Sequence, residues 1–213
     1  MVINQVTDFA QNKIFKPRTI LFTTREKYEK VDLDKEINII TISSKGGLKE
    51  VDNRLRKGLR QLSSVENIES RLGTQGCFLY LATDGDILIG YYWSIIPQEP
   101  VSHDSFFISP GEALLFNAYV RPQFRRQGIY TQLLAKAHNH VLINSNAYMS
   151  YTIVEDRNKP SLRANNEFGL DKYGKNYLIK LWGRNVLSIV SYPDFISILK
   201  VWRGEKIGHV EVH

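Results

Sequence analysis

Cysteine is nearly absent from this sequence. Cys77 is the single cysteine among 213 residues, so no disulfide can form within the chain, and the composition fits a reducing compartment. Cys77 begins an apolar run, Cys77-Phe78-Leu79-Tyr80-Leu81. This setting favours a small buried hydrophobe over a nucleophile.

The sequence also lacks a hydrophobic stretch of membrane-spanning length. The most apolar late segment, residues 186–202, is interrupted by Pro193 and Asp194. The first eight residues lack the apolar core of a signal peptide, and there is no internal repeat or low-complexity tract. With 43% hydrophobic and 23% charged residues, the composition predicts a globular protein of the cytoplasm.

Common catalytic signatures are missing as well. The chain has neither the Gly-x-Ser-x-Gly elbow of serine hydrolases nor the P-loop of nucleoside triphosphatases. His138 and His140 are two residues apart on a predicted helix, so their side chains point to different faces and do not form a chelating pair. We therefore expect no metal site and a surface position for each histidine.

The most informative segment that is present covers residues 114–142. It predicts a strand over 114–120, a turn at Pro122, a basic loop, and then a helix. A helix start offers free backbone N–H groups and the positive end of a dipole, and both favour a bound phosphate. Gly128 lets the backbone approach that phosphate closely, and Arg125 and Arg126 add positive charge. The helix is indicated by apolar residues at helical spacing, namely Ile129, Leu133, Leu134, Ala137, Val141 and Leu142.

The loop resembles the fingerprint of the GNAT acetyltransferases, Arg/Gln-x-x-Gly-x-Gly/Ala at the start of a helix after a strand. Here it is Arg125-Arg126-Gln127-Gly128-Ile129-Tyr130, with Tyr130 in place of the last small residue. The resemblance implies that the pyrophosphate of coenzyme A binds backbone N–H groups of this loop and that the pantetheine arm pairs with Val120 as an added strand would. The implied coenzyme A-binding residues are Tyr119, Val120, Arg125, Arg126, Gln127, Gly128, Ile129, Tyr130 and Thr131.

A second segment resembles the later motif of the same family. Residues 148–154 predict a buried strand, and a polar loop follows with Pro160 suited to the first turn of a helix. In the family an Asn follows this strand, a Ser or Ala comes three residues on, and the helix ends in a Gly and an apolar residue. Asn158, Ser161 and Gly169-Leu170 fill those places. The resemblance adds Asn158 and Ser161 to the cofactor-binding residues; for Asn158 an ordinary cap or loop residue is the alternative.

The remaining pattern predicts an α/β (α+β) chain. Asp84-Gly85-Asp86 predicts a hairpin turn, and the long loop over 97–111 could border an acceptor pocket. The resemblance implies a single mixed, mostly antiparallel central sheet flanked by helices and splayed between the strands ending at Val120 and Val154. We expect residues 37–213 to form the GNAT-like acyltransferase domain and residues 1–36 an N-terminal extension partly packed on it.

Specific elements are expected along the chain. Strands are predicted over 19–23, 37–42, 77–83, 87–96, 114–120, 148–154, 176–182 and 186–192. Helices are predicted over 49–64 and 65–72, after 128 and after 160. A last short helix is predicted from four apolar residues at helical spacing, Phe195, Ile198, Leu199 and Trp202.

The catalytic groups are harder to assign. Acyl transfer from a thioester to an amine needs a neutral amine, a polarised carbonyl and a proton for the departing thiolate. Glu112, just before the predicted strand, is the candidate base, with an exposed turn residue as the alternative. Many family members have a tyrosine acid where this chain has Asn165, and Tyr173 could substitute for it.

Strand alternation provides the last catalytic candidate. If residues 116–120 alternate regularly, Asn117 and Tyr119 share one face and Phe116, Ala118 and Val120 the other. Glu112, Asn117 and Tyr173 are therefore the predicted catalytic residues.

The charge of the chain bears on the acceptor. The net charge is +6, and the densest basic run, residues 54–60, lies on a predicted amphipathic helix with its arginines outward. A solvated helix face is one interpretation. The other uses the resemblance, in which the first helices cover the acceptor site, so these arginines would suit a phosphorylated or nucleotide-linked acceptor.

The sequence thus predicts an acyl-CoA-dependent N-acyltransferase. It would transfer acetyl from acetyl-CoA by direct attack of the primary amine of a small, anionic, nucleotide-sugar-like acceptor, as a monomer or homodimer and without metal, nucleic acid or membrane. The alternatives are a non-catalytic coenzyme A-binding or regulatory module and an acetyltransferase acting on a peptide or protein amine. A nucleic-acid-binding protein is the weakest alternative, since the sequence shows neither a helix-turn-helix pattern nor a run of basic residues interleaved with aromatic ones.

Overall fold

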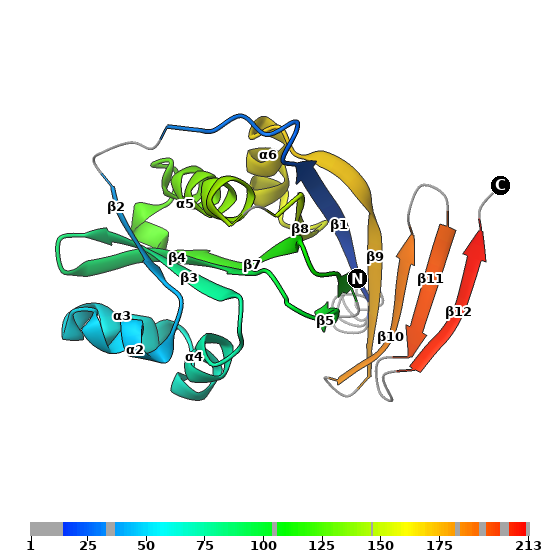
Figure 1. Ribbon diagram of the computed structural model, residues 1–213, viewed down its shortest axis with the longest axis horizontal. Helices are drawn as coiled ribbons and strands as arrows, with labels where there is room; N and C mark the ends of the chain where they lie inside the picture. Colours follow the sequence, from blue (N-terminus) through cyan, green and yellow to red (C-terminus); the bar gives the residue numbers. More distant parts are fainter. Residues whose placement is uncertain are drawn as a thin grey trace, which may run out of the picture. The chain divides into compact units, whose positions relative to one another are not determined.

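The computed structural model describes residues 15–32, 37–103, 106–145, 147–181, 184–191, 195–200 and 205–211. The chain forms two compact units that interleave along the sequence. The central unit contains Thr23–Pro100 and Ser109–Tyr151, and the terminal unit contains Met1–Phe22, Val101–Ile108 and Thr152–His213. Figure 1 gives the course of the chain by colour.

The central unit is a sheet with helices on both faces. Its strands lie in the order β7-β4-β3-β2, and the neighbours pair antiparallel. Figure 1 shows α2, α3 and α4 along one face of these strands and α5 along the other. The strands are β2 (Asn38–Ile42), β3 (Cys77–Asp84), β4 (Ile87–Ile95) and β7 (Glu112–Val120), and the helices are α2 (Lys45–Glu50), α3 (Asn53–Leu62), α4 (Val65–Leu72), the 3-10 helix η1 (Pro122–Phe124), α5 (Ile129–His138) and the π-helix η2 (Asn139–Asn144).

The terminal unit contains strands from both ends of the described chain. Its strand order is β12-β11-β10-β9-β1-β8, while β5 and β6 form a separate two-stranded sheet. β8 begins in the central unit and continues into the terminal unit at Thr152, and β1 continues into the central unit at Thr23. The elements are β1 (Phe15–Thr24), β5 (Val101–His103), β6 (Phe106–Ile108), β8 (Met149–Glu155), α6 (Lys159–Glu167), β9 (Asp171–Leu181), β10 (Arg184–Ser191), β11 (Phe195–Lys200) and β12 (Glu205–Glu211).

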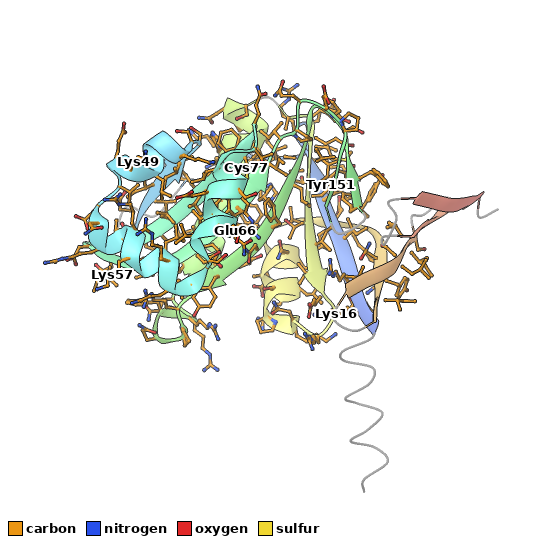
Figure 2. The ribbon with its side chains drawn as sticks, turned by 90° about the horizontal axis from the view of Figure 1, so that it is seen from below. Lys16, Lys49, Lys57, Glu66, Cys77 and Tyr151 are labelled. Carbon is orange, nitrogen blue, oxygen red and sulfur yellow. The ribbon has the colours of Figure 1, made fainter. Side chains whose placement is uncertain are left out.

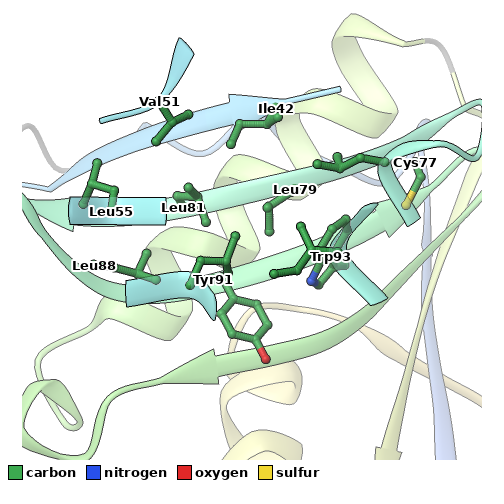
Figure 3. Packing of buried hydrophobic residues seen from close by; sticks show 12 residues of the cluster. Ile42, Val51, Leu55, Cys77, Leu79, Leu81, Leu88, Tyr91 and Trp93 are labelled. Atoms are coloured by element: carbon green, nitrogen blue, oxygen red, sulfur yellow. The ribbon is translucent and has the colours of Figure 1, made fainter. Parts of the chain in front are cut away.

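The core of the central unit lies between its sheet and α3 and α4. Leu55 and Leu59 of α3 and Ile68 and Leu72 of α4 form one cluster with apolar residues of β3 and β4, including Trp93 (Figure 3). Each fully buried side chain of this size contributes roughly 1.5–3 kcal/mol. Charged residues of α2 and α3, such as Lys49 and Lys57, are exposed (Figure 2), as an amphipathic pattern requires.

The predicted fold class is confirmed: the chain is α/β with a mostly antiparallel sheet flanked by helices. The hairpin at Asp84-Gly85-Asp86 is also present, joining β3 to β4, with Gly85 at φ +56. The division at residue 37 and the splay between the strands ending at Val120 and Val154 stay predictions. Residues 1–14 of the predicted extension lie outside the described residues.

Three element predictions are wrong. Residues 49–64 do not form one helix, because α2 ends at Glu50 and the Asp52 side chain accepts the Arg54 N–H (2.7 Å) to start α3. The segment 97–111 is not a plain loop, because it contains the hairpin β5–β6. Phe195–Lys200 is strand β11, paired with β10 and β12. A short apolar run is compatible with the periodicity of a helix and with that of a strand, and here its pairing with β10 and β12 makes it a strand. Trp202 lies outside the described residues.

Candidate functional site

The loop between β7 and α5 is held by local backbone hydrogen bonds. Arg121 N–H donates to the Ile89 carbonyl (2.9 Å), Phe124 N–H to the Arg121 carbonyl (2.9 Å), and Arg125 N–H to the Pro122 carbonyl (3.2 Å). The first of these bonds ties the end of β7 to β4, and the other two form the single turn η1. These hydrogen bonds therefore hold the backbone of the loop in place before α5 begins.

Gly128 is the N-cap of α5, and its backbone is left-handed at φ 74. Its carbonyl accepts the first helical bond, from Gln132 N–H (3.0 Å), and no side chain caps the helix. The first turn contains no acidic residue, and a Cβ added at Gly128 would meet nothing within 4 Å. The N–H groups at this helix start have no helical acceptors, and without an acidic side chain in the first turn they suit an anion.

The two arginines of the loop take different positions. Arg125 turns back over β7: its Nε donates to the Val120 carbonyl (3.0 Å), and its guanidinium carbon is 6.0 Å from the centre of the Tyr119 ring. Arg126 is exposed at φ 64. Gln127 closes the loop, since its Nε2 donates to the Gln123 carbonyl (3.1 Å).

The first three residues of α5, Ile129, Tyr130 and Thr131, differ in their exposure. Ile129 is buried, and Thr131 is exposed. Tyr130, which replaces the small residue of the fingerprint, is half-buried with its ring 6.0 Å from that of Tyr92. The bulk of Tyr130 therefore rests against the sheet.

β7 contains a bulge at Asn117. Trp93 pairs with Phe116 and Tyr91 with Tyr119, so two residues of β7 oppose one residue of β4, and Asn117 is left-handed at φ 52. A bulge leaves its extra residue out of the ladder and reverses the alternation beyond it. The predicted alternation is therefore wrong, because Phe116 and Tyr119 pack against the same core cluster.

An arginine from α4 covers the aromatic side chains at this bulge. The Arg71 guanidinium carbon is 5.2 Å from the Trp93 ring centre and 5.4 Å from that of Phe116, and the two rings stack at 6.5 Å. Tyr91 and Tyr119 stack beside them at 5.8 Å. Arg71 carries no sequence signal of this position, because it is an ordinary last-turn residue of a helix and no spacing connects it to β4 or β7.

Glu112, the predicted base, begins β7 and is half-buried. One carboxylate oxygen accepts the Ser109 N–H (2.7 Å), and the other accepts the Tyr151 hydroxyl (3.1 Å). Tyr151, labelled in Figure 2, is itself buried. The structure thus gives Glu112 a phenolic partner that the sequence did not indicate.

The second motif lies in the terminal unit. Asn158 is the N-cap of α6, and its side-chain oxygen accepts the Ser161 N–H (3.3 Å). Asn165 is fully buried, with its Nδ2 donating to the Ser161 carbonyl (2.7 Å). Tyr173 is half-buried, with its ring edge-on to Phe22 at 5.2 Å.

The prediction that His138 and His140 lie on the surface is wrong. His138 is fully buried; its Nδ1 is 2.9 Å from the Ser150 hydroxyl, and burial lowers the pKa of its imidazole to about 3. His140 is half-buried, 2.8 Å from the Tyr80 hydroxyl, and burial lowers its pKa as well. No group of histidine, cysteine and acidic side chains within the described ranges could hold a metal ion. Among the helices there, none is long and apolar enough to cross a membrane.

Residues 49–170, more than half of the chain, match the sequence profile of the acetyltransferase (GNAT) family. The chain belongs to this family. The predicted enzyme class, an N-acetyltransferase, is therefore confirmed, and acetyl-CoA is the donor that this class uses. No curated protein sequence matches the chain.

Solved structures show the same fold at low identity. The tandem GNAT protein from the clavulanic acid biosynthesis pathway is 15% identical, with a TM-score of 0.52 over 80% of this chain and 56% of that one. A Drosophila protein is 14% identical, with a TM-score of 0.52 over 85% of this chain and 57% of that one. The aminoglycoside N-acetyltransferase AAC(6')-Iy in complex with CoA is 20% identical, with a TM-score of 0.48 over 63% of this chain and 91% of that one.

Proposed function

We propose that this enzyme transfers the acetyl group of acetyl-CoA to the primary amine of a small acceptor, and that the start of α5 binds the donor's pyrophosphate. The observation that carries the proposal is the helix start at Gly128, which no side chain caps, which has a left-handed backbone, and where an added Cβ would meet nothing within 4 Å. Backbone N–H groups and the helix dipole together favour a pyrophosphate there, which carries two negative charges. Gln127, Ile129, Tyr130 and Thr131 contribute backbone at this point.

The loop arginines have separate parts in this proposal. Arg126 is exposed and supplies charge to the phosphates. Arg125 supports the strand end, because it binds the Val120 carbonyl and lies over Tyr119. The pantetheine arm would pair with the backbone of Tyr119 and Val120, and Asn158 and Ser161 of the terminal unit keep their proposed role as donor contacts.

In the reaction the amine nitrogen attacks the thioester carbonyl carbon, the carbon–sulfur bond breaks, and the thiolate leaves. Glu112 is the proposed base, acting directly or through water, with Tyr151 donating to it. At Asn117 the bulge leaves backbone out of the ladder, which suits polarisation of the carbonyl. Tyr173 is the proposed proton donor to sulfur, because the packed Asn165 amide cannot supply that proton.

We propose that the acceptor is small and anionic, such as a nucleotide-linked amino sugar. The net charge of +6 supports this class, because a basic protein attracts anionic substrates. The aminoglycoside acetyltransferase among the similar structures acts on a small amine compound, as its name states. A peptide or protein amine is the competing acceptor, and an amine panel distinguishes the two.

Calorimetric titration with acetyl-CoA and coenzyme A tests the donor site. Wild-type protein should bind both, and Gly128→Glu should lose binding, because the carboxylate would occupy the anion site. Gly85→Glu is the matched control: Gly85 is also left-handed with nothing within 4 Å of an added Cβ, but it belongs to the β3–β4 hairpin. No binding by folded wild-type protein, or equal binding by Gly128→Glu, would overturn the proposal.

A further inference from the structure

Arg71 places its charge over the Trp93–Phe116 pair, where β4 meets β7. It comes from the last turn of α4, and both ring centres lie within 5.4 Å of its guanidinium carbon. Phe116 directly precedes the bulge residue Asn117. The α4 arginine, the aromatic pair and the bulge therefore meet at one place in the central unit.

Two hydrogen-bond donors at this place lack acceptors. Arg71 Nη1 and Trp93 Nε1 are both buried and have no hydrogen-bond partner among the described residues. Trp93 is 0% exposed, and its indole nitrogen is drawn in Figure 3. Buried donors are normally paired, because each unsatisfied one costs free energy. Because Arg71 stacks on the Trp93 ring, an acceptor group from outside the chain would satisfy both donors.

The charge of Arg71 is also unpaired. The ion pairs described for this chain include none to Arg71, which is half-buried. Stacking on two aromatic rings offsets only part of its lost hydration. Its positive field reaches Cys77 and Tyr91, where it opposes the burial that raises the pKa of each group. An anion bound here would supply the counter-charge that no described side chain provides.

The arginines of α3, for which the sequence leaves open both a solvated face and an acceptor-binding role, are placed differently. Arg54 forms an exposed ion pair with Asp86, and Arg60 is exposed. Water satisfies exposed guanidinium groups, so neither requires a ligand. Arg56, the third arginine of α3, is half-buried and its Nε also has no partner among the described residues, so Arg71 is set apart by its stacking on two aromatic rings.

The position along β7 also fits the acceptor. Phe116 lies four residues before Val120, roughly 13 Å along a strand. A donor whose pyrophosphate rests on the start of α5 and whose arm follows β7 would extend its thioester toward Phe116. An acceptor group held at Arg71 would then lie near the reacting end of the donor.

We propose that Arg71 and the Trp93 indole N–H together bind an oxyanion, a carboxylate or a phosphate, of the amine acceptor. This rests on the proposed function, because it assigns the acceptor part of that site. Arginine suits both anions, since its planar fork donates two parallel hydrogen bonds. Such a site would make the enzyme prefer acceptor amines that carry a negative charge close to the amino group.

The direct test follows the Trp93 indole N–H resonance in ¹⁵N-labelled protein saturated with coenzyme A. The chain has three tryptophans, so loss of one indole peak in Trp93→Phe assigns it. Titration with acetate, inorganic phosphate, β-alanine and glucosamine 6-phosphate should shift this peak, and β-alaninamide and glucosamine should shift it far less. In Arg71→Gln the response should disappear. An unmoved Trp93 peak with every anion would overturn the proposal.

The kinetic test compares amines that differ only in the anion. The ratio of kcat/KM for glucosamine 6-phosphate over glucosamine, and for β-alanine over β-alaninamide, should favour the anion in the wild type for at least one pair. Arg71→Gln should lower that ratio by about tenfold to a hundredfold, as expected for a hydrogen bond to a charged group, and Arg71→Lys by less. The phosphate and carboxylate pairs separate the two sources of the anion.

Arg60→Gln is the matched control, since it removes the same charge from an exposed position on α3. Its ratio should equal that of the wild type. An equal fall in Arg60→Gln and Arg71→Gln would mean that the general positive field sets the preference, and would overturn the assignment to Arg71. Failure of coenzyme A to bind wild-type protein would instead overturn the proposed function, so the two failures are distinguishable.

Discussion

The start of α5 and the Arg71 face are built in opposite ways within the central unit. At the start of α5, neighbouring residues present backbone N–H groups around an exposed glycine with a left-handed backbone. At the Arg71 face, side chains from α4, β4 and β7 meet in a buried aromatic cluster. Binding at the first site depends on local backbone geometry, whereas binding at the second depends on the packing that also stabilises the fold. Variants at the two sites should therefore separate donor affinity from stability.

The largest effect is expected from Trp93→Ala. Trp93 is fully buried and stacked on Phe116, so its truncation should lower the free energy of unfolding by about 3–5 kcal/mol. Urea denaturation measures this loss, and Trp93→Phe should retain most of the stability. A loss below about 1 kcal/mol for Trp93→Ala would show that the Arg71 face is not part of the stabilising core.

Gly128→Glu should lower the affinity for coenzyme A by roughly a hundredfold or more, because a carboxylate beside the pyrophosphate is repelled by it. Calorimetry measures the affinity, and the Trp93 indole peak should still respond to phosphate in this variant. If Gly128→Glu abolished both responses in a folded protein, the two sites would not be independent.

The pH dependence of stability tests the buried His138. Its pKa in the folded state is about 3, below the ordinary 6.5, so the unfolded chain takes up a proton that the folded chain does not. Stability should be unaffected by this group above pH 6.5 and should fall, by up to about 1.4 kcal/mol per pH unit, as pH drops toward 3. Urea denaturation between pH 7 and 4.5 should give a smaller slope for His138→Asn. Parallel curves would contradict the burial of a neutral imidazole.

The smallest effect is expected at the bulge. Asn117 has φ 52, so Asn117→Ala should lower stability by about 1 kcal/mol, while Asn117→Gly adopts this backbone without strain. If the bulge acts through its backbone, Asn117→Gly should keep kcat. Equal loss of kcat in both variants would instead assign the catalytic part to the Asn117 side chain.

The sequence predicted what depends on consecutive residues. The loop before α5 was identified because strand, glycine and helix follow one another, and Asn158 was identified with its cap alternative for the same reason. The division between α2 and α3 was missed because Asp52 is compatible with both a helix and a cap. The bulge at Asn117 was missed because it arises from the register between β4 and β7. Arg71 was missed because its meaning depends on Trp93 and Phe116, which are distant in sequence.

The π-helix η2 continues α5 and anchors three separate segments through consecutive residues. His138, just before it, contacts Ser150 of β8; Asn139 binds the Tyr28 hydroxyl and both backbone groups of Val31; and His140 contacts Tyr80 of β3.

In a π-helix each backbone hydrogen bond spans five residues, one more than in an α-helix. Deletion of a single residue from this segment would therefore rotate the residues after it about the helix axis. Val141 and Leu142, which are buried, would then no longer both face the core. An evolving chain can change residues at this helix more easily than it can change length there, whereas the exposed turn at Gly85 tolerates insertion.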